Sequence, residues 1–70
     1  MKILVVGGGG FIGSRLVAAL KDRGDDVVVT GRSEARLRKR FPGAQCVAWD
    51  PVAGPPPAEA LAGVDAVVNL

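Results

Sequence analysis

Short aliphatic runs alternate along the chain with segments that have helical periodicity. The runs lie at residues 2–6, 27–29, 45–49 and 66–70, and glycine, proline or charged residues bound each of them. Such runs are typical of strands that are buried on both faces of a parallel sheet. The pattern therefore predicts a strand in each run, the last of them buried like the others.

The segment between the first two predicted strands has the spacing of an amphipathic helix over residues 11–23. One face of this helix is expected to be apolar and to pack on the sheet, and it carries Ile12, Leu16, Ala19 and Leu20. The polar face is expected to meet water with Ser14, Arg15, Lys21 and Asp22. Gly24 follows at a position where a left-handed residue commonly ends a helix.

Two further helices are predicted between the later strands. Ser33 is a suitable N-cap for a helix over 34–40, which Pro42 and Gly43 end. Residues 51–57 contain prolines and a glycine, and are expected to form a surface loop on the ligand side of the sheet before a short helix over 58–62.

Alternation of strands and helices predicts an α/β fold with the order βαβαβ(α)β. Right-handed crossovers then give the amino-terminal half of a Rossmann doubly wound parallel sheet. Seventy residues are enough for one domain only. Because the chain ends on a strand with no following helix, we expect residues 1–70 to be a Rossmann segment incomplete at its carboxyl end, marginally stable alone and able to self-associate through an open sheet edge.

Composition narrows the classes of function. The chain has no His and a single cysteine, Cys46, which excludes an internal disulfide and argues against a metal site. Cys46 is expected to be a small buried residue. No apolar run approaches the length of about 20 residues that a membrane helix needs, and no signal peptide is evident. A cytoplasmic protein that does not enter a membrane is expected.

Glycine is concentrated directly after the first predicted strand. Residues 7–13 satisfy Gly-x-x-Gly-x-x-Gly from Gly7 and also Gly-x-Gly-x-x-Gly from Gly8. The first glycine permits a tight turn, Gly10 lets the backbone approach a pyrophosphate, and Gly13 lets the helix pack closely on the strand. Since this motif lies between a predicted strand and a predicted helix, it predicts a dinucleotide site rather than an ordinary turn. No Gly-Lys-Ser/Thr follows Gly10, which disfavours an ATP phosphate loop.

The residues at the end of the second predicted strand indicate which dinucleotide the site prefers. A site that prefers NAD places an Asp or Glu there to bind the adenosine ribose, whereas this chain has Arg32 and Ser33. A guanidinium can hold a 2′-phosphate by paired hydrogen bonds, so Arg32 and Ser33 predict NADP. Asp25 and Asp26 lie at the opposite end of the strand and are expected to be solvated turn residues.

Three further features bear on ligand contacts. Asp50, just after the third predicted strand, is expected to bind the adenine amino group, with an Asp-Pro turn as the alternative. Trp49 is expected to be a packing residue. The basic run 36–40 lacks interleaved aromatic residues and is not expected to bind nucleic acid, although Arg36 would add to the positive field around a phosphate.

These residues resemble an extended short-chain dehydrogenase/reductase over the whole chain. The similarity is carried by the glycine motif, Arg23-Gly24, Trp49-Asp50 and the run 65–70. Within that superfamily the chain is most similar to the NAD-dependent epimerase/dehydratase family, in its epimerase-like NADP-binding branch. It departs from the usual pattern at Gly9 and Val6, where many relatives carry Thr.

The resemblance implies a set of cofactor contacts. The residues that would contact the pyrophosphate are Gly7, Gly10, Phe11, Ile12 and Gly13. Arg32 and Ser33 would contact the adenosine phosphate, and Asp50 would contact the adenine. Leu70 would lie beside the cofactor. Family catalysis uses a Tyr-x-x-x-Lys pair, and this chain has no Tyr. Catalytic residues and the small-molecule substrate site are therefore expected beyond Leu70. The chain is expected to bind NADP(H) for an epimerase, dehydratase or reductase, or for a non-catalytic sensor or assembly protein.

Overall fold

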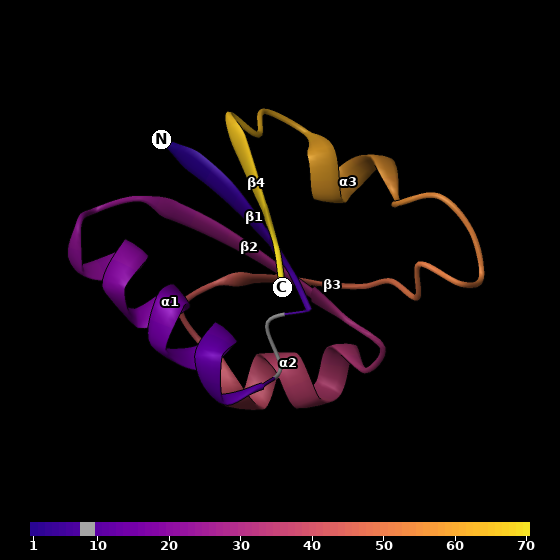
Figure 1. The fold of residues 1–70 in the computed structure, drawn as a ribbon, viewed down its shortest axis with the longest axis horizontal. Coiled ribbons are helices and arrows are strands. Elements are labelled where there is room, and N and C mark those ends of the chain that lie inside the picture. The colour runs from indigo at the N-terminus through magenta and orange to yellow at the C-terminus, as the bar shows by residue number, and fades with distance from the viewer. Residues whose placement is uncertain (8–9) are drawn as a thin grey trace.

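The computed structural model describes residues 1–7 and 10–70, and it contains the predicted alternation of strands and helices (Figure 1). In chain order the elements are β1 (Lys2–Val6), α1 (Phe11–Asp22), β2 (Asp26–Gly31), α2 (Glu34–Arg40), β3 (Gln45–Ala48), α3 (Ala58–Leu61) and β4 (Ala66–Asn69). The predicted boundaries agree within a residue or two at most ends, because glycines, prolines and caps mark them.

The strands form one four-stranded sheet in the order β3-β2-β1-β4, and every neighbouring pair is parallel. This is the order of the first strands of a Rossmann sheet. Helices α1 and α2 cover one face, and α3 lies against the other (Figure 1). The predicted α/β doubly wound architecture is confirmed.

Alternate residues of the aliphatic strands fill two cores on opposite faces of the sheet. The core under α1 and α2 contains Ile3, Val5, Val27, Val29 and Cys46 from the strands, together with Val17, Leu20, Leu37 and Phe41. The core under α3 is smaller and consists of Leu4, Val28, Val47 and Ala60. Each fully buried aliphatic side chain contributes about 1.5–3 kcal/mol, and the central strands β1 and β2 supply such side chains to both cores.

The predicted apolar face of α1 is wrong at two positions. The buried residues are Gly13, Val17 and Leu20, while Ile12 is 72% exposed and Ala19 is also exposed. The helix is rotated so that a stripe through Gly13, Val17 and Leu20 meets the sheet, and this rotation turns Ile12 and Ala19 away from it. Leu16 packs at the margin of the core, as predicted.

Strand β4 is present, but its prediction as a buried strand is wrong. Val67 is 56% exposed, while Ala66 and Val68 only partly enter the core. The reason is coverage: α3 is a single turn whose one buried residue, Ala60, is small. Strand β4 is therefore an edge of the sheet with one open face.

The amino ends of the strands are tied together by charged groups. Asp25 was expected to be solvated, yet its side chain is only 7% exposed and forms ion pairs with the Met1 amino group at 3.6 Å and with Arg23 Nε at 3.1 Å. Asp65 Oδ2 accepts from the backbone N–H of Lys2 at 2.8 Å. The prediction for Asp25 was wrong because its partner Met1 is distant in sequence, whereas Asp26 is exposed as expected.

Cys46 is buried, as predicted. Burial raises the pKa of its thiol, an effect that Arg38 partly opposes and Glu34 adds to. The thiol is therefore a protonated packing group at neutral pH. Among the helices of the described residues, none is long and apolar enough to cross a bilayer.

Candidate functional site: the carboxyl edge of the sheet

The carboxyl ends of all parallel strands meet at one edge of the sheet, and the predicted site residues follow these ends. Gly7 follows β1, Arg32 follows β2, Asp50 lies beyond β3, and Leu70 follows β4. From β1 the chain builds the sheet outward through β2 and β3 on one side, and then returns to add β4 on the other side of β1. Ligands of open α/β sheets bind in the crevice at such a switch point. The fold thus brings residues from the whole length of the chain to one edge.

Gly7 turns the chain out of β1 directly beside Leu70. Its φ of +80° lies in the left-handed region, which glycine adopts at little cost. Its N–H donates to Thr30 O at 3.3 Å, and the Leu70 N–H donates to Val6 O at 3.1 Å. A Cβ at Gly7 would stand 3.5 Å from Leu70 O. That distance is an ordinary contact, so the left-handed backbone, rather than a lack of space, is what favours glycine at this turn.

The amino end of α1 is free of its own side-chain caps. Gly10 is the N-cap with extended backbone, no side chain accepts a hydrogen bond from the first turn, and that turn contains no acid. Phe11 and Ile12 are 71% and 72% exposed, and Gly13 is buried against the sheet. Gly8 and Gly9 lie outside the described residues, so the overlapping motif from Gly8 is not tested. The described end of α1 suits an anion, because its N–H groups and its dipole carry positive charge.

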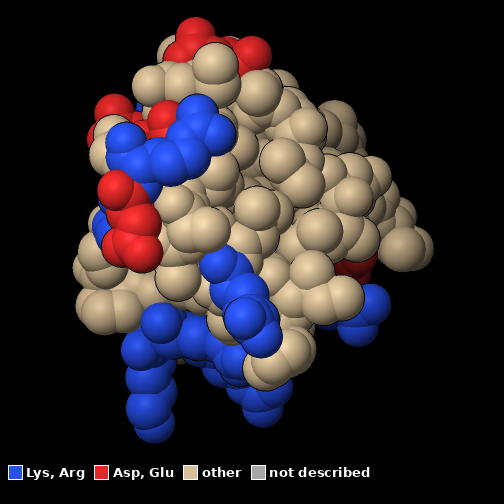
Figure 2. Space-filling view, turned by 60° about the vertical axis from the view of Figure 1, so that its left-hand side comes forward, with Lys and Arg blue, Asp and Glu red and all other residues tan. Residues whose placement is uncertain are grey.

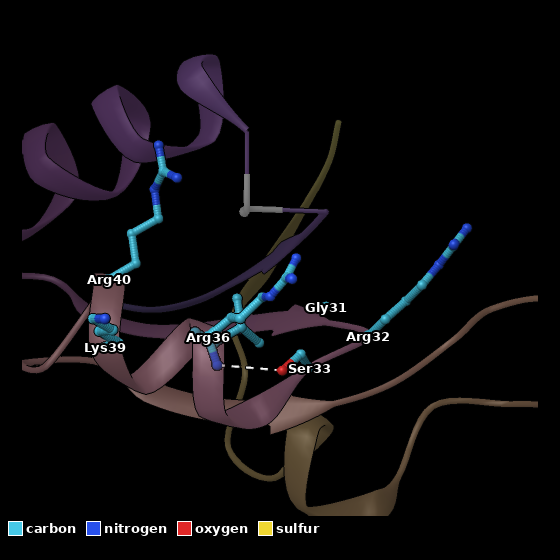
Figure 3. A pocket seen from close by; sticks show the side chains of 7 residues that line it. Gly31, Arg32, Ser33, Arg36, Lys39 and Arg40 are labelled. Atoms are coloured by element: carbon cyan, nitrogen blue, oxygen red, sulfur yellow. Dashed lines mark hydrogen bonds between the residues drawn. The ribbon is translucent and has the colours of Figure 1, made fainter.

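A second part of the edge is an open pocket of about 540 Å³ between the end of β2 and α2. It is lined by Gly31, Arg32, Ser33, Arg36, Leu37, Lys39 and Arg40. Figure 3 shows Arg32 and Arg36 extending to the same side and Arg40 reaching toward α1. The lining contains four cations and no carboxylate. Such a pocket favours an anionic group of a ligand.

Ser33 has a structural role in this pocket. Its Oγ accepts a hydrogen bond from the Arg36 N–H at 3.3 Å and so caps α2, as predicted (Figure 3). A hydroxyl that accepts in this way still has its own O–H to donate. The cap therefore fixes the Ser33 side chain next to Arg32 without using its donor.

Charge is unevenly distributed over the molecule. Five of the nine Lys and Arg residues lie between Arg32 and Arg40, where Glu34 is the only acid. Figure 2 shows most of the basic side chains at the lower end of the face, while basic and acidic side chains lie together at its upper left. Only one cation of this segment, Arg38, has an ion pair among the described residues, at 3.4 Å from Glu34. The others remain available to an external anion.

Asp50 and Trp49 organise the loop after β3. Asp50 Oδ1 accepts from the Val52 N–H at 3.0 Å, which is the Asp-Pro turn that was the alternative to a ligand contact. Trp49 is half-buried, and its Nε1 donates to Gly54 O at 2.9 Å. The Trp49 N–H also donates to Gly31 O at 2.8 Å. These bonds hold Asp50 close to the end of β2. Trp49 belongs to neither core of the sheet, so its role as a packing residue stays a prediction.

One contact of the site was missed by reasoning from the sequence. Ser14 was expected to face water, but its Oγ accepts from Arg40 Nε at 2.7 Å and donates to Gly10 O at 3.0 Å. Arg40 was interpreted only as a cation at the end of a helix. The two residues are 26 positions apart, and no periodicity or motif connects them, so no signal in the chain could have found the pair.

Comparisons with known proteins agree with this geometry. The chain is 39% identical over all 70 residues to the human protein named "Epimerase family protein SDR39U1", of which it spans 20% of the length. Its fold is similar to that of a protein from Lactobacillus casei of known crystal structure, with a TM-score of 0.81 and 31% identity over 99% of this chain and 32% of that one.

The family comparison covers nearly the whole chain. The sequence model of the NAD dependent epimerase/dehydratase family matches residues 3–70. This range includes the glycine turn, the basic pocket and β4 with its carboxyl end. The chain therefore belongs to the NAD dependent epimerase/dehydratase family and has the NAD(P)-binding Rossmann fold of that family.

Proposed function

We propose that the chain binds NADP(H) in preference to NAD(H), and that Arg32 and Ser33 hold the 2′-phosphate of the adenosine ribose. The observation that carries this proposal is the pocket at the end of β2, which is lined by four cations and by no carboxylate. An acid at this place would accept from the ribose hydroxyls of NAD and would repel a 2′-phosphate. A basic pocket has the opposite preference.

Arg32 is the principal contact in this proposal. It lies one residue beyond β2, is exposed, and has no ion pair among residues 1–7 and 10–70. Its guanidinium can therefore turn to a phosphate without giving up another partner. Ser33 adds its O–H as a donor while it caps α2, and Arg36 raises the positive potential of the same pocket.

The remaining contacts follow the carboxyl edge. We assign the pyrophosphate to the turn at Gly7 and to the amino end of α1 at Gly10, Phe11, Ile12 and Gly13. The exposed Leu70 then packs beside the cofactor at the switch point between β1 and β4. Asp50 Oδ1 is engaged in a turn, so we assign Oδ2 to the adenine amino group. Residues 1–70 act as one cofactor-binding unit in this proposal.

The proposed function of these residues is binding. Bound NADP(H) supplies a hydride donor or acceptor, and the chain contributes the positions that hold it. Because the chain has no tyrosine, it lacks the acid or base that the resemblance implies for turnover. The same site would serve an epimerase, a reductase or an NADP-binding sensor of the cytoplasm.

Calorimetric titration of the protein with NADPH and with NADH tests the proposal. A charge-assisted hydrogen bond contributes about 1.5–3 kcal/mol, so we expect NADPH to bind at least about tenfold more tightly. Arg32→Ala should remove most of this difference by weakening NADPH alone. Arg38→Ala, an equal loss of charge outside the pocket, is the matched control and should leave the ratio unchanged. Equal affinities for the two nucleotides in the unmodified protein would contradict the assignment of Arg32.

A further inference from the structure

Arg40 forms a bridge between two helices that otherwise pack mainly on the sheet. Its Nε donates to Ser14 Oγ at 2.7 Å, which is within the range of short, charge-assisted hydrogen bonds. Arg40 is the last residue of α2, and Ser14 lies in the first turns of α1. The bond thus joins the end of the basic pocket to the helix whose amino end faces the crevice.

Ser14 carries this contact on to the N-cap of α1. Its Oγ donates to Gly10 O at 3.0 Å, and its N–H donates to the same oxygen at 3.0 Å. Gly10 has no side chain, and no side-chain cap holds this end of the helix. The position of the Gly10 peptide therefore depends on Ser14, and the orientation of the Ser14 hydroxyl depends on Arg40.

The positive charge of Arg40 lies at an unusual place, near the amino end of another helix. Its guanidinium lies beside the amino-terminal turns of α1, where the helix dipole is positive and a cation is unfavourable. Within the described residues, no carboxylate lies within salt-bridge distance of Arg40. This arrangement is unfavourable until an anion arrives, and the expected anion is the pyrophosphate at the same helix end.

We propose that Arg40 is a positioning residue for the pyrophosphate, acting through Ser14 on the Gly10 N-cap of α1. The proposal deepens the proposed function and rests on it only in using the same cofactor. Since NADP and NAD share the pyrophosphate, Arg40 should affect both nucleotides equally. In this respect it differs from Arg32, which should affect NADP alone.

The test is a double-mutant cycle on Arg40→Gln and Ser14→Ala, with NADPH and NADH titrated against each variant. Arg40→Gln should weaken both nucleotides by a similar factor, roughly three- to tenfold. The same substitution on the Ser14→Ala background should add little, because the path through the hydroxyl is already lost. Arg40→Lys retains a cationic donor that can reach Ser14 and should recover part of the affinity.

Matched measurements separate this role from general damage. Arg38→Gln removes an equal charge from the same helix and should change neither affinity. Thermal unfolding of each variant shows whether a loss of affinity follows a loss of stability, and the Arg40→Lys rescue is not expected for a purely structural defect. A preference for NADH in the unmodified protein would sink the proposed function, while the Arg40 comparison would still be made with NADH.

Three results would overturn the Arg40 proposal. A loss confined to NADPH would make Arg40 a direct contact of the 2′-phosphate. Independent, additive effects of Arg40→Gln and Ser14→Ala would show that Arg40 does not act through the hydroxyl. Unchanged binding of both nucleotides in Arg40→Gln would exclude any role at the site.

Discussion

The two edges of the sheet use charged residues in opposite ways. At the amino edge two carboxylates are paired within the fold: Asp25 forms ion pairs with the Met1 amino group and Arg23, and Asp65 accepts from the Lys2 N–H. At the carboxyl edge the pocket cations Arg32 and Arg36 have no carboxylate partner among the described residues. The comparison shows that charges at one edge are paired within the fold, whereas the pocket cations Arg32 and Arg36 at the other have no carboxylate partner among the described residues.

The largest expected effects come from two glycines that share a backbone conformation at opposite edges. Gly7 has φ +80° at the carboxyl edge, and Gly24 has φ +87° at the amino edge. Substitution of either by Ala should destabilise the protein by about 1–2 kcal/mol, because a Cβ disfavours the left-handed region. Only Gly7→Ala should also weaken nucleotide binding, since only Gly7 lies beside the crevice.

Denaturant unfolding and NADPH titration of both variants check this prediction. Gly24 has open space where a Cβ would be added, so Gly24→Ala is the control for the backbone term alone. Equal losses of affinity in the two variants would remove the functional distinction between the edges.

A smaller effect is expected from the ion pairs of the amino edge. Asp25→Asn should lower the free energy of unfolding by about 1 kcal/mol, because both partners of this carboxylate are half or more exposed and water screens the pairs. The ratio of NADPH to NADH affinity should not change. Asp22→Asn, at an exposed residue outside the ion pairs among the described residues, is the control and should alter neither quantity. A shift in nucleotide preference in Asp25→Asn would show that the edges are coupled.

The smallest effect concerns the buried thiol between the two edges. Burial raises the pKa of Cys46 in the folded state above its ordinary value of 9.0. The unfolded chain therefore loses the thiol proton first, and stability is lost as the pH rises above that value through the folded pKa. Cys46→Ala should show a shallower decline in stability at alkaline pH. Unfolding curves of the two proteins at neutral and alkaline pH measure the difference, and parallel declines would contradict it.

Much of the fold could be predicted because local signals mark its boundaries. Gly7, Gly24 and Ser33 lie at the predicted turn, helix end and N-cap, and each has the conformation or hydrogen bond that its residue type favours. Burial was predicted less well, since it depends on what covers each surface. Ile12 is exposed because α1 turns a stripe through Gly13, Val17 and Leu20 to the sheet, and Val67 is exposed because α3 is short.

The candidate site divides in the same way. Five candidate site residues could be proposed from the sequence because each follows directly on a recognisable strand or turn: Gly7, Arg32, Ser33, Asp50 and Leu70. The ion pair of Asp25 with Met1 and the hydrogen bond of Arg40 to Ser14 could not be predicted, because residues distant in the chain meet only after the sheet has formed. Motifs identify positions along the chain, and tertiary packing decides which of them act together.

Trp49 also makes the site observable. It is the only tryptophan in the chain and precedes Asp50 directly. It lies just after the end of β3, and its indole N–H donates to Gly54 O in the following loop. All intrinsic indole emission therefore originates at the carboxyl edge. The emission overlaps the absorption of a reduced nicotinamide, so the protein contains its own fluorescent reporter, and occupancy of the edge can be followed in solution without a label.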